Sequence, residues 1–210
     1  MAASPWPAIH AERAALADDL QDLAADRWST PSLCADWTVL DVLAHMTATA
    51  SMTPPAFFGK LARTGFRFER MVRRDIGAMS DGGPAATLAR FRQVQDASSG
   101  PPGPVDSWLG ETLVHAEDIR RPLGIPHTYP SGQLVRVADF YKGSNLLIGA
   151  KNRIEGMALR ATDATWSTGS GPEAAGPILA LVLVMTGRAA GLADLAGDGV
   201  SLLQDRIQPG

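Results

Sequence analysis

The feature that most constrains this fold is the helical spacing of apolar residues, which recurs through the first 152 residues between proline- and glycine-rich turns. Apolar side chains at steps of three and four residues predict amphipathic helices, whose apolar faces must be buried. The predicted helices cover residues 9–26, 39–50, 60–74 with a bend at Gly65, 85–97, 106–123 and 131–149. These segments together predict a helical bundle.

After Arg153 the pattern changes. Residues 157–161 and 164–168 have strand-like patterning, and Thr162-Asp163 between them predicts a hairpin. Residues 178–186 fit either an apolar helix or a buried strand, and residues 200–203 fit a last strand. We therefore expect a mainly α chain, with a helical domain at residues 1–152 and a small α+β domain at residues 153–210.

Composition narrows the classes of function. A net charge of −3 and a pI near 5.8 give no reason to expect nucleic acid as the main partner. The single cysteine, Cys34, cannot form an intramolecular disulfide, which suits a reducing cytoplasm. The N-terminus lacks the pattern of a signal peptide, and the longest apolar run, 177–185, is far shorter than the ~20 residues of a bilayer span. We expect a soluble cytoplasmic protein without a membrane partner.

The strongest chemical signal lies in the helix predicted for residues 106–123. Glu111 and His115 are four residues apart and share one helical face, which Asp118 joins one turn later. Apolar neighbours close to this face predict that it is buried, and a buried carboxylate beside an imidazole needs compensation. A metal ion and a mutual ion pair explain the pair equally well. Asp118 fits a surface acid paired with Arg120 or Arg121, or a group that orients a metal-binding histidine.

His45 is the best source of a third ligand among the four histidines. Thr38-Val39-Leu40-Asp41 fits a capping box, so a helix should begin at about Val39 and place His45 on its inward face. A histidine on an apolar face is more often a hydrogen-bonded core residue than a ligand. The metal hypothesis is therefore a divalent ion held by His45, Glu111 and His115, with at least one coordination position open.

Two other features suggest weaker alternatives. Cys34 would be a nucleophile only with a base nearby, and it fits a small buried hydrophobic residue better. The stretch from Lys60 to Arg74 is basic and amphipathic, which is typical of a solvated helix face. Some of its arginines would also suit a carboxylate-bearing ligand, and the whole stretch would suit an interaction module.

Several blocks together resemble one family. They are residues 28–37 with Pro31 and Cys34, residues 38–45, residues 111–124, and in the tail residues 162–166, 169–172 and 185–188. The chain resembles the DinB-like metal-binding four-helix bundles, in particular the actinobacterial group similar to mycothiol-dependent maleylpyruvate isomerase. The resemblance implies an up-down-down-up four-helix bundle with a small α+β C-terminal tail. It also implies metal ligands at His45, Glu111 and His115.

The resemblance further implies a metal-dependent enzyme that uses mycothiol as a thiol cofactor or cosubstrate. A metal-bound thiolate would attack a small electrophilic substrate, as in an isomerase or S-transferase. Arg188 is the nearest match to an arginine that the family associates with a dicarboxylate substrate, although attraction to helix-terminal carbonyls explains it equally well. Zinc is the first candidate ion, and nickel or iron would suit the same ligands. A non-catalytic metal sensor or sequestering protein is the alternative, as a monomer or a homodimer.

Overall fold

The computed structural model describes residues 3–146 and 148–207, which form two compact units, Met1–His127 and Thr128–Gly210. The second unit includes the helix Ser131–Lys142, which packs there against the helix Ile178–Met185. The expected domain boundary between residues 152 and 153 stays a prediction. Among the described residues, no helix combines the length and apolarity needed to cross a bilayer.

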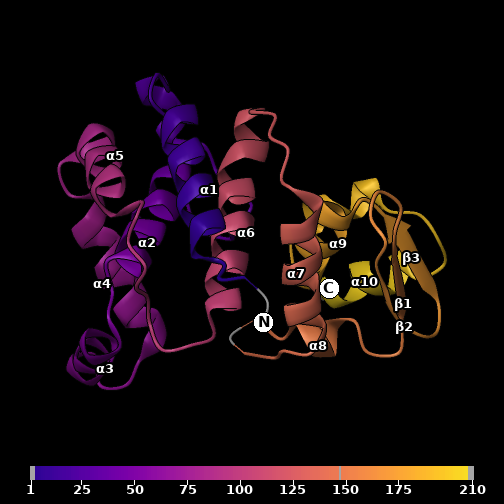
Figure 1. Cartoon of the computed structure of the whole chain (residues 1–210). Coiled ribbons are helices and arrows are strands. Elements are labelled where there is room, and N and C mark those ends of the chain that lie inside the picture. The colour runs from indigo at the N-terminus through magenta and orange to yellow at the C-terminus, as the bar shows by residue number, and fades with distance from the viewer. Residues whose placement is uncertain (1–2, 147, 208–210) are drawn as a thin grey trace. The chain divides into compact units, whose positions relative to one another are not determined.

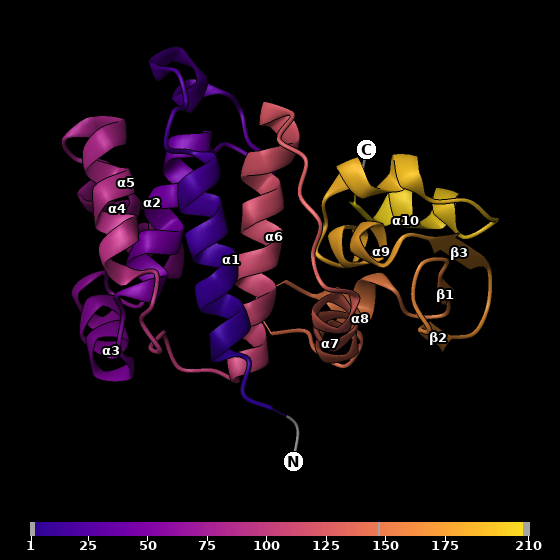
Figure 2. The same ribbon diagram turned by 45° about the horizontal axis from the view of Figure 1, so that its top comes forward.

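The first unit is a helical bundle. Helices α1, α2, α5 and α6 form its four-helix core: α2 packs against α5 and α6, and α1 packs against the same two helices. Both Figure 1 and Figure 2 show α1 and α6 side by side. The helices of this unit are α1 (Trp6–Asp19), α2 (Val39–Ala50), α3 (Pro54–Arg63), α4 (Phe68–Ser80), α5 (Gly83–Val94) and α6 (Val105–Leu123), with a 3-10 turn, η1 (Ala25–Ser29).

The apolar faces predicted from spacing meet in one core. Each of the four core helices contributes fully buried side chains to it, among them Leu16, Leu43, Phe91 and Ile119. Polar contacts also join α1 to α6: the fully buried Arg120 pairs with Asp19 at 2.7 Å. Because an unpaired buried guanidinium would be strongly destabilising, this pair fixes how the two helices pack.

Helix α2 begins as the capping box predicted. The Thr38 hydroxyl accepts a hydrogen bond from the Asp41 amide at 3.2 Å, and the Thr38 amide donates to the Asp41 carboxylate at 2.9 Å. These bonds satisfy backbone groups that the first helical turn would leave open. The helix that carries His45 therefore has a defined start.

Other helix boundaries differ from the prediction. Helix α1 starts at Trp6 because Pro7 is tolerated in a first turn, and it ends at Asp19 instead of residue 26. The helix predicted for residues 60–74 is broken into α3 and α4, since Gly65 and Phe66 adopt φ angles of +66° and +61°. A helix cannot continue through two left-handed residues, so the expected bend is a turn.

The second unit combines a small sheet with helices. Its strand order is β2-β1-β3, with β1 antiparallel to β2 and parallel to β3. Helix α9 packs against β1, β3 and α7. The elements are α7 (Ser131–Lys142), α8 (Ala150–Arg153), β1 (Ala158–Ala161), β2 (Ser167–Gly169), β3 (Glu173–Gly176), α9 (Ile178–Met185), the 3-10 segment η2 (Ala189–Asp194) and α10 (Val200–Ile207).

The expected fold class, mainly helical with a small α+β C-terminal part, is confirmed, but three details of the second unit were wrong. The last strand predicted at residues 200–203 is the helix α10, because Val200, Leu203 and Ile207 follow helical spacing. The helix predicted for residues 131–149 ends at Lys142, and β3 was not predicted.

Candidate metal centre

The three predicted ligands come together in the first unit. Glu111 and His115 lie one turn apart on α6, and His45 lies in the middle of α2, which packs against α6. One potential ligand atom of each residue lies within 4.8 Å of the other two. The imidazole rings of His45 and His115 have centroids 5.0 Å apart and meet edge to face. Side chains 66 residues apart in sequence thus face one small volume.

Glu111 provides the test of whether a cation fits. Both of its carboxylate oxygens are buried and have no hydrogen-bond partner among the described residues. Burial raises the pKa of Glu111, while electrostatic interactions with His115 and Arg13 and the nearby hydroxyls of Thr49 and Thr112 act against that rise. Neither hydroxyl reaches hydrogen-bonding geometry. A buried carboxylate without partners is costly, and a bound cation would remove that cost.

Asp118 orients His115. The His115 Nδ1 lies 2.9 Å from the Asp118 carboxylate, whose side chain is fully buried. Asp118 is therefore not the surface acid that its sequence position suggested, and Arg121 pairs with Glu117 instead. A carboxylate on one ring nitrogen leaves the other, Nε2, available to a metal and makes it a better ligand.

A loop covers both histidines on one side. Trp37 lies with its ring centroid 4.9 Å from that of His45 and 6.2 Å from that of His115. Backbone hydrogen bonds from Ser32 to Trp37 and from Val39 to Thr30 close the loop on itself, both at 2.9 Å. The loop, residues 30–38, therefore holds an aromatic wall against the imidazoles.

A proline in α6 anchors this loop. The carbonyl of Asp118 would normally accept the amide four residues later, but that residue is Pro122, which has no N–H. The Leu33 amide donates to this carbonyl instead, at 3.2 Å. Asp118 thus contributes its carboxylate to His115 and its backbone to the loop that carries Trp37.

Three ligands of this kind suit a divalent cation. Two imidazoles and one carboxylate form a donor set that zinc accepts, and a four-coordinate ion would keep one position for a water, thiol or substrate. Nickel and iron accept the same donors.

The matched family covers these residues. Residues 9–120 match the profile of a family described as the mycothiol maleylpyruvate isomerase N-terminal domain. The chain belongs to this family. Its matched range contains His45, Glu111 and His115, and it leaves out the whole second unit, Arg188 included.

Two solved structures have the fold of this family member. Both are crystal structures of the mycothiol-dependent maleylpyruvate isomerase, one of them a mutant. The mutant gives a TM-score of 0.60 and the other 0.54, each with 15% sequence identity and coverage of 92% of this chain and 91% of the solved chain. At that identity the likeness shows the DinB-like fold. A comparison with curated proteins found no match.

The remaining candidates of the sequence lie elsewhere. His10 contacts Ser98, and His127 pairs with Glu12 at 2.8 Å. Cys34 is half-buried in the loop and packs against the apolar core, as a small hydrophobic residue would. Arg188 belongs to the second unit, where its guanidinium donates to the carbonyl of Thr186 at the end of α9. Its expected role in catalysis stays a prediction.

The sequence did not identify two residues beside the candidate metal centre, Arg13 and Trp37. Arg13 is 1% exposed, donates to the carbonyl of Ala97 at 3.1 Å, and lies close enough to Glu111 to influence its charge. Burial lowers the pKa of Arg13, and the Glu111 carboxylate acts against that shift. The signal was present: Ile9, Arg13 and Leu16 follow helical spacing on the buried face of α1. Trp37 was recognised only as the last residue of the block 28–37 that resembles the family.

Proposed function

We propose that this protein is a metal-dependent enzyme that uses mycothiol as a thiol cofactor or cosubstrate, of the maleylpyruvate isomerase or S-transferase type. The observation that carries the proposal is the convergence of His45, Glu111 and His115, with the Glu111 carboxylate buried and otherwise without partners. Membership of the mycothiol maleylpyruvate isomerase family supports the thiol and a small electrophilic substrate.

The three ligands would hold a divalent ion, with zinc as the first candidate. A bound divalent cation lowers the pKa of a coordinating thiol, so the mycothiol sulfur would be held as a nucleophilic thiolate. Asp118 keeps the His115 ring in the tautomer that leaves Nε2 for the ion. Trp37 excludes water from one side of both imidazoles. Arg13 offsets the negative charge of Glu111 from within the bundle.

Two finer parts of the proposal concern the substrate and the compartment. Arg188 is the residue that we assign to a carboxylate of the substrate, on the strength of the family resemblance alone. A thiol cosubstrate requires a reducing compartment, so we place the reaction in the cytoplasm.

The test uses the full chain, freed of metal and reloaded with cobalt as a spectroscopic substitute for zinc. Adding mycothiol should produce the intense absorption of a thiolate bound to cobalt, and S-methyl mycothiol, which cannot ionise, should not. The zinc-loaded protein with mycothiol should then turn over maleylpyruvate or another small electrophile.

A second candidate function uses the same centre without catalysis. The buried, partnerless carboxylate equally suits a protein that senses or sequesters the ion. Suppose that the protein binds cobalt and zinc, but that mycothiol does not alter the cobalt spectrum and no electrophile is converted in its presence. The enzyme proposal then fails, and this candidate replaces it. Failure to bind any divalent ion would reject both.

A further inference from the structure

The hairpin formed by α3 and α4, residues 54–80, supplies no residue to the candidate metal centre, so that centre does not account for its exposed side chains. Helix α3 has no buried residue, although Pro54, Phe57, Phe58 and Leu61 make it strongly apolar on one side. Folding normally buries such a face, and large exposed apolar patches mark interaction sites.

The exposed aromatic side chains of the described residues are concentrated on this hairpin. Phe58, Phe66 and Phe68 are 59%, 77% and 40% exposed, and Leu146 is the one other large hydrophobic residue exposed in the described ranges. Phe66 forms the turn between the helices with a φ of +61°, a conformation that bulky residues rarely adopt. The chain thus accepts backbone strain where it presents a phenylalanine to solvent.

The same hairpin carries a strong positive charge. Residues 54–80 contain six Lys and Arg against two Asp and Glu, whereas the whole chain has 19 and 22. The hairpin is therefore basic on a protein whose remaining residues are clearly acidic. Such an asymmetry orients a protein toward an anionic surface.

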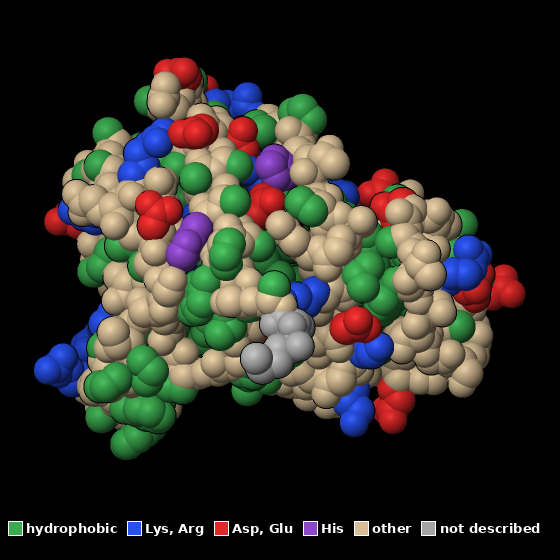
Figure 3. Space-filling view, viewed as in Figure 1, with side chains coloured by type: hydrophobic (Ala, Val, Ile, Leu, Met, Phe, Trp, Pro, Cys, Tyr) green, Lys and Arg blue, Asp and Glu red, His purple; other side chains and the backbone are tan. Residues whose placement is uncertain are grey.

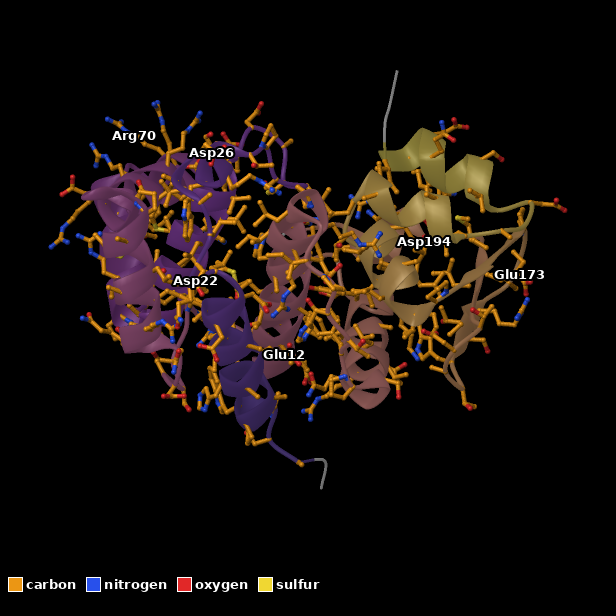
Figure 4. All side chains as sticks on the ribbon, turned by 90° about the horizontal axis from the view of Figure 1, so that it is seen from above. Glu12, Asp22, Asp26, Arg70, Glu173 and Asp194 are labelled. Carbon is orange, nitrogen blue, oxygen red and sulfur yellow. The ribbon has the colours of Figure 1, made fainter. Side chains whose placement is uncertain are left out.

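Most of these cations have no internal partner. Within residues 3–146 and 148–207, no carboxylate lies within ion-pair distance of Arg63, Arg67, Arg70 or Arg74. Figure 4 shows Arg70 among side chains whose nitrogen-bearing ends extend away from the ribbon. Between α3 and α4, a pocket of about 140 Å³ is lined by Arg63, by Arg74 and by the ion pair of Lys60 with Asp75. The net positive charge of this lining suits a phosphate group.

The aromatic and basic side chains occupy one region. Phe57 has ring contacts with both Phe58, at 5.5 Å, and Phe68, at 6.4 Å, so both helices contribute to one aromatic cluster. In Figure 3, hydrophobic side chains gather at the lower left, where Figure 1 places α3, with Lys and Arg side chains beside them. An apolar centre flanked by cations is the arrangement of helices that lie in a membrane interface.

We propose that the α3–α4 hairpin docks this protein on the surface of an anionic phospholipid bilayer. Phe58, Phe66 and Phe68 enter the boundary between headgroups and acyl chains, and the arginines bind lipid phosphates. The expectation of no membrane partner rested on the lack of a spanning segment, and docking at the surface requires none.

Two other occupants fit less well. A second copy of the chain in a two-fold symmetric contact would bring two faces of the same positive charge together, which is unfavourable. A single-stranded nucleic acid needs open ring faces for stacking. Here Phe57 meets Phe58 at 82° and Phe68 at 50°, so these three rings cover parts of one another and Phe66 alone keeps both faces open, too little for a run of stacked bases.

Sedimentation of the full chain with phospholipid vesicles tests the proposal. We expect binding to vesicles of phosphatidylcholine mixed with phosphatidylglycerol, little binding to phosphatidylcholine alone, and weakening of the former by salt. The variant Arg67→Gln/Arg70→Gln/Arg74→Gln should bind about 100-fold more weakly, at roughly fivefold per charge. The variant Phe58→Ser/Phe66→Ser should lose about tenfold or more.

Matched controls come from outside the hairpin. Leu146→Ser removes an equally exposed apolar side chain, and Lys151→Gln removes an exposed charge, so neither should change vesicle binding. All variants should keep their zinc affinity and helical circular dichroism, which separates docking from misfolding.

Several results would overturn the proposal. The proposal is rejected if the folded wild type does not bind anionic vesicles. It is also rejected if the hairpin variants bind these vesicles as tightly as the wild type does. The same holds if the Arg and Phe substitutions abolish binding to a single-stranded oligonucleotide or to polyglutamate, or dissociate a dimer, while vesicles are not bound. None of these results depends on whether the metal centre is catalytic.

Discussion

At the scale of single residues, the burial of the Glu111 carboxylate leads to opposite expectations for the metal-free and metal-bound protein. Glu111→Gln removes a buried charge that has no hydrogen-bond partner, so the metal-free variant should be at least as stable as the wild type. Its zinc affinity should fall by about 100-fold or more because a charged ligand is lost. Denaturant unfolding and calorimetric zinc titration measure the two effects.

The control for this prediction is Glu155→Gln, which neutralises an exposed carboxylate of the second unit. It should change neither quantity. A Glu111→Gln protein that binds zinc as tightly as the wild type would show that Glu111 is not a ligand.

Asp118 should act on the metal through His115. Asp118→Asn keeps the size of the side chain but removes the charge that supports the imidazole, so zinc affinity should fall by about 10- to 100-fold. Zinc titrations of the variant against the wild type measure this loss. An unchanged affinity would mean that the Asp118 contact serves folding alone.

The sequence grouped the three candidate ligands, but it did not identify the side chains around them. His45, Glu111 and His115 could be grouped because helical spacing and the family pattern constrain them. The burial of Asp118 depends on the loop that packs over α6, and helical spacing carries no information on such a contact. Arg13 was overlooked because charged residues are rarely fully buried, although its position on α1 pointed inward.

At the scale of elements, the capping box of α2 should contribute measurably to stability. Thr38→Ala removes the hydroxyl that accepts the Asp41 amide, and we expect a loss of about 1 kcal/mol in the free energy of unfolding. Thr53→Ala at the start of α3 is the matched control. There the hydroxyl accepts a longer bond, 3.4 Å, on an exposed helix, so its loss should be smaller. Equal losses in the two variants would contradict this account.

A second prediction at this scale concerns how the stability of the second unit depends on pH through Asp139 on α7, which accepts hydrogen bonds from Lys142 and Trp166. The hydrogen bond from Lys142 lowers the pKa of Asp139, and the Trp166 indole adds to the effect. A carboxylate whose pKa is lowered by folding stabilises the fold above its unfolded pKa and loses that contribution as pH falls through its folded pKa.

Asp139→Asn should therefore destabilise the second unit at neutral pH by well under about 1 kcal/mol, because the pair is half exposed. The difference from the wild type should shrink as the pH falls below the usual aspartate pKa of about 3.9 and through the lowered pKa of Asp139. Thermal unfolding of both proteins across this range is the measurement. A difference that grows on acidification would reverse the assigned sign.

Element boundaries could be predicted only where a local signal was strong. Helix α2 was predicted from Val39 to Ala50 because its capping box is a local device. The break between α3 and α4 depends on Phe66 adopting a left-handed conformation, which its residue type does not favour. The strand β3 has the sequence Glu-Ala-Ala-Gly, which contains no bulky apolar residue, and its pairing with β1 defines it.

At the scale of the whole molecule, the ion should stabilise one unit and not the other. All three candidate ligands lie in the unit Met1–His127, so zinc at about 100 times its dissociation constant should stabilise that unit by about 2.7 kcal/mol. Differential scanning calorimetry with zinc and with a chelator should therefore move the transition of the first unit alone. The Glu111→Gln variant should show no shift, and a zinc effect confined to Thr128–Gly210 would contradict the assignment.

The tether between Leu33 and Asp118 has a consequence for how proteins of this kind can diversify. This hydrogen bond joins two backbone groups of the chain, so every residue except proline at position 33 can supply the donor. The side chains of residues 30–37 are therefore not needed for this attachment of the loop to α6. Mutation can remodel the wall that they present to the histidines, and with it the range of molecules admitted there, while the loop remains attached.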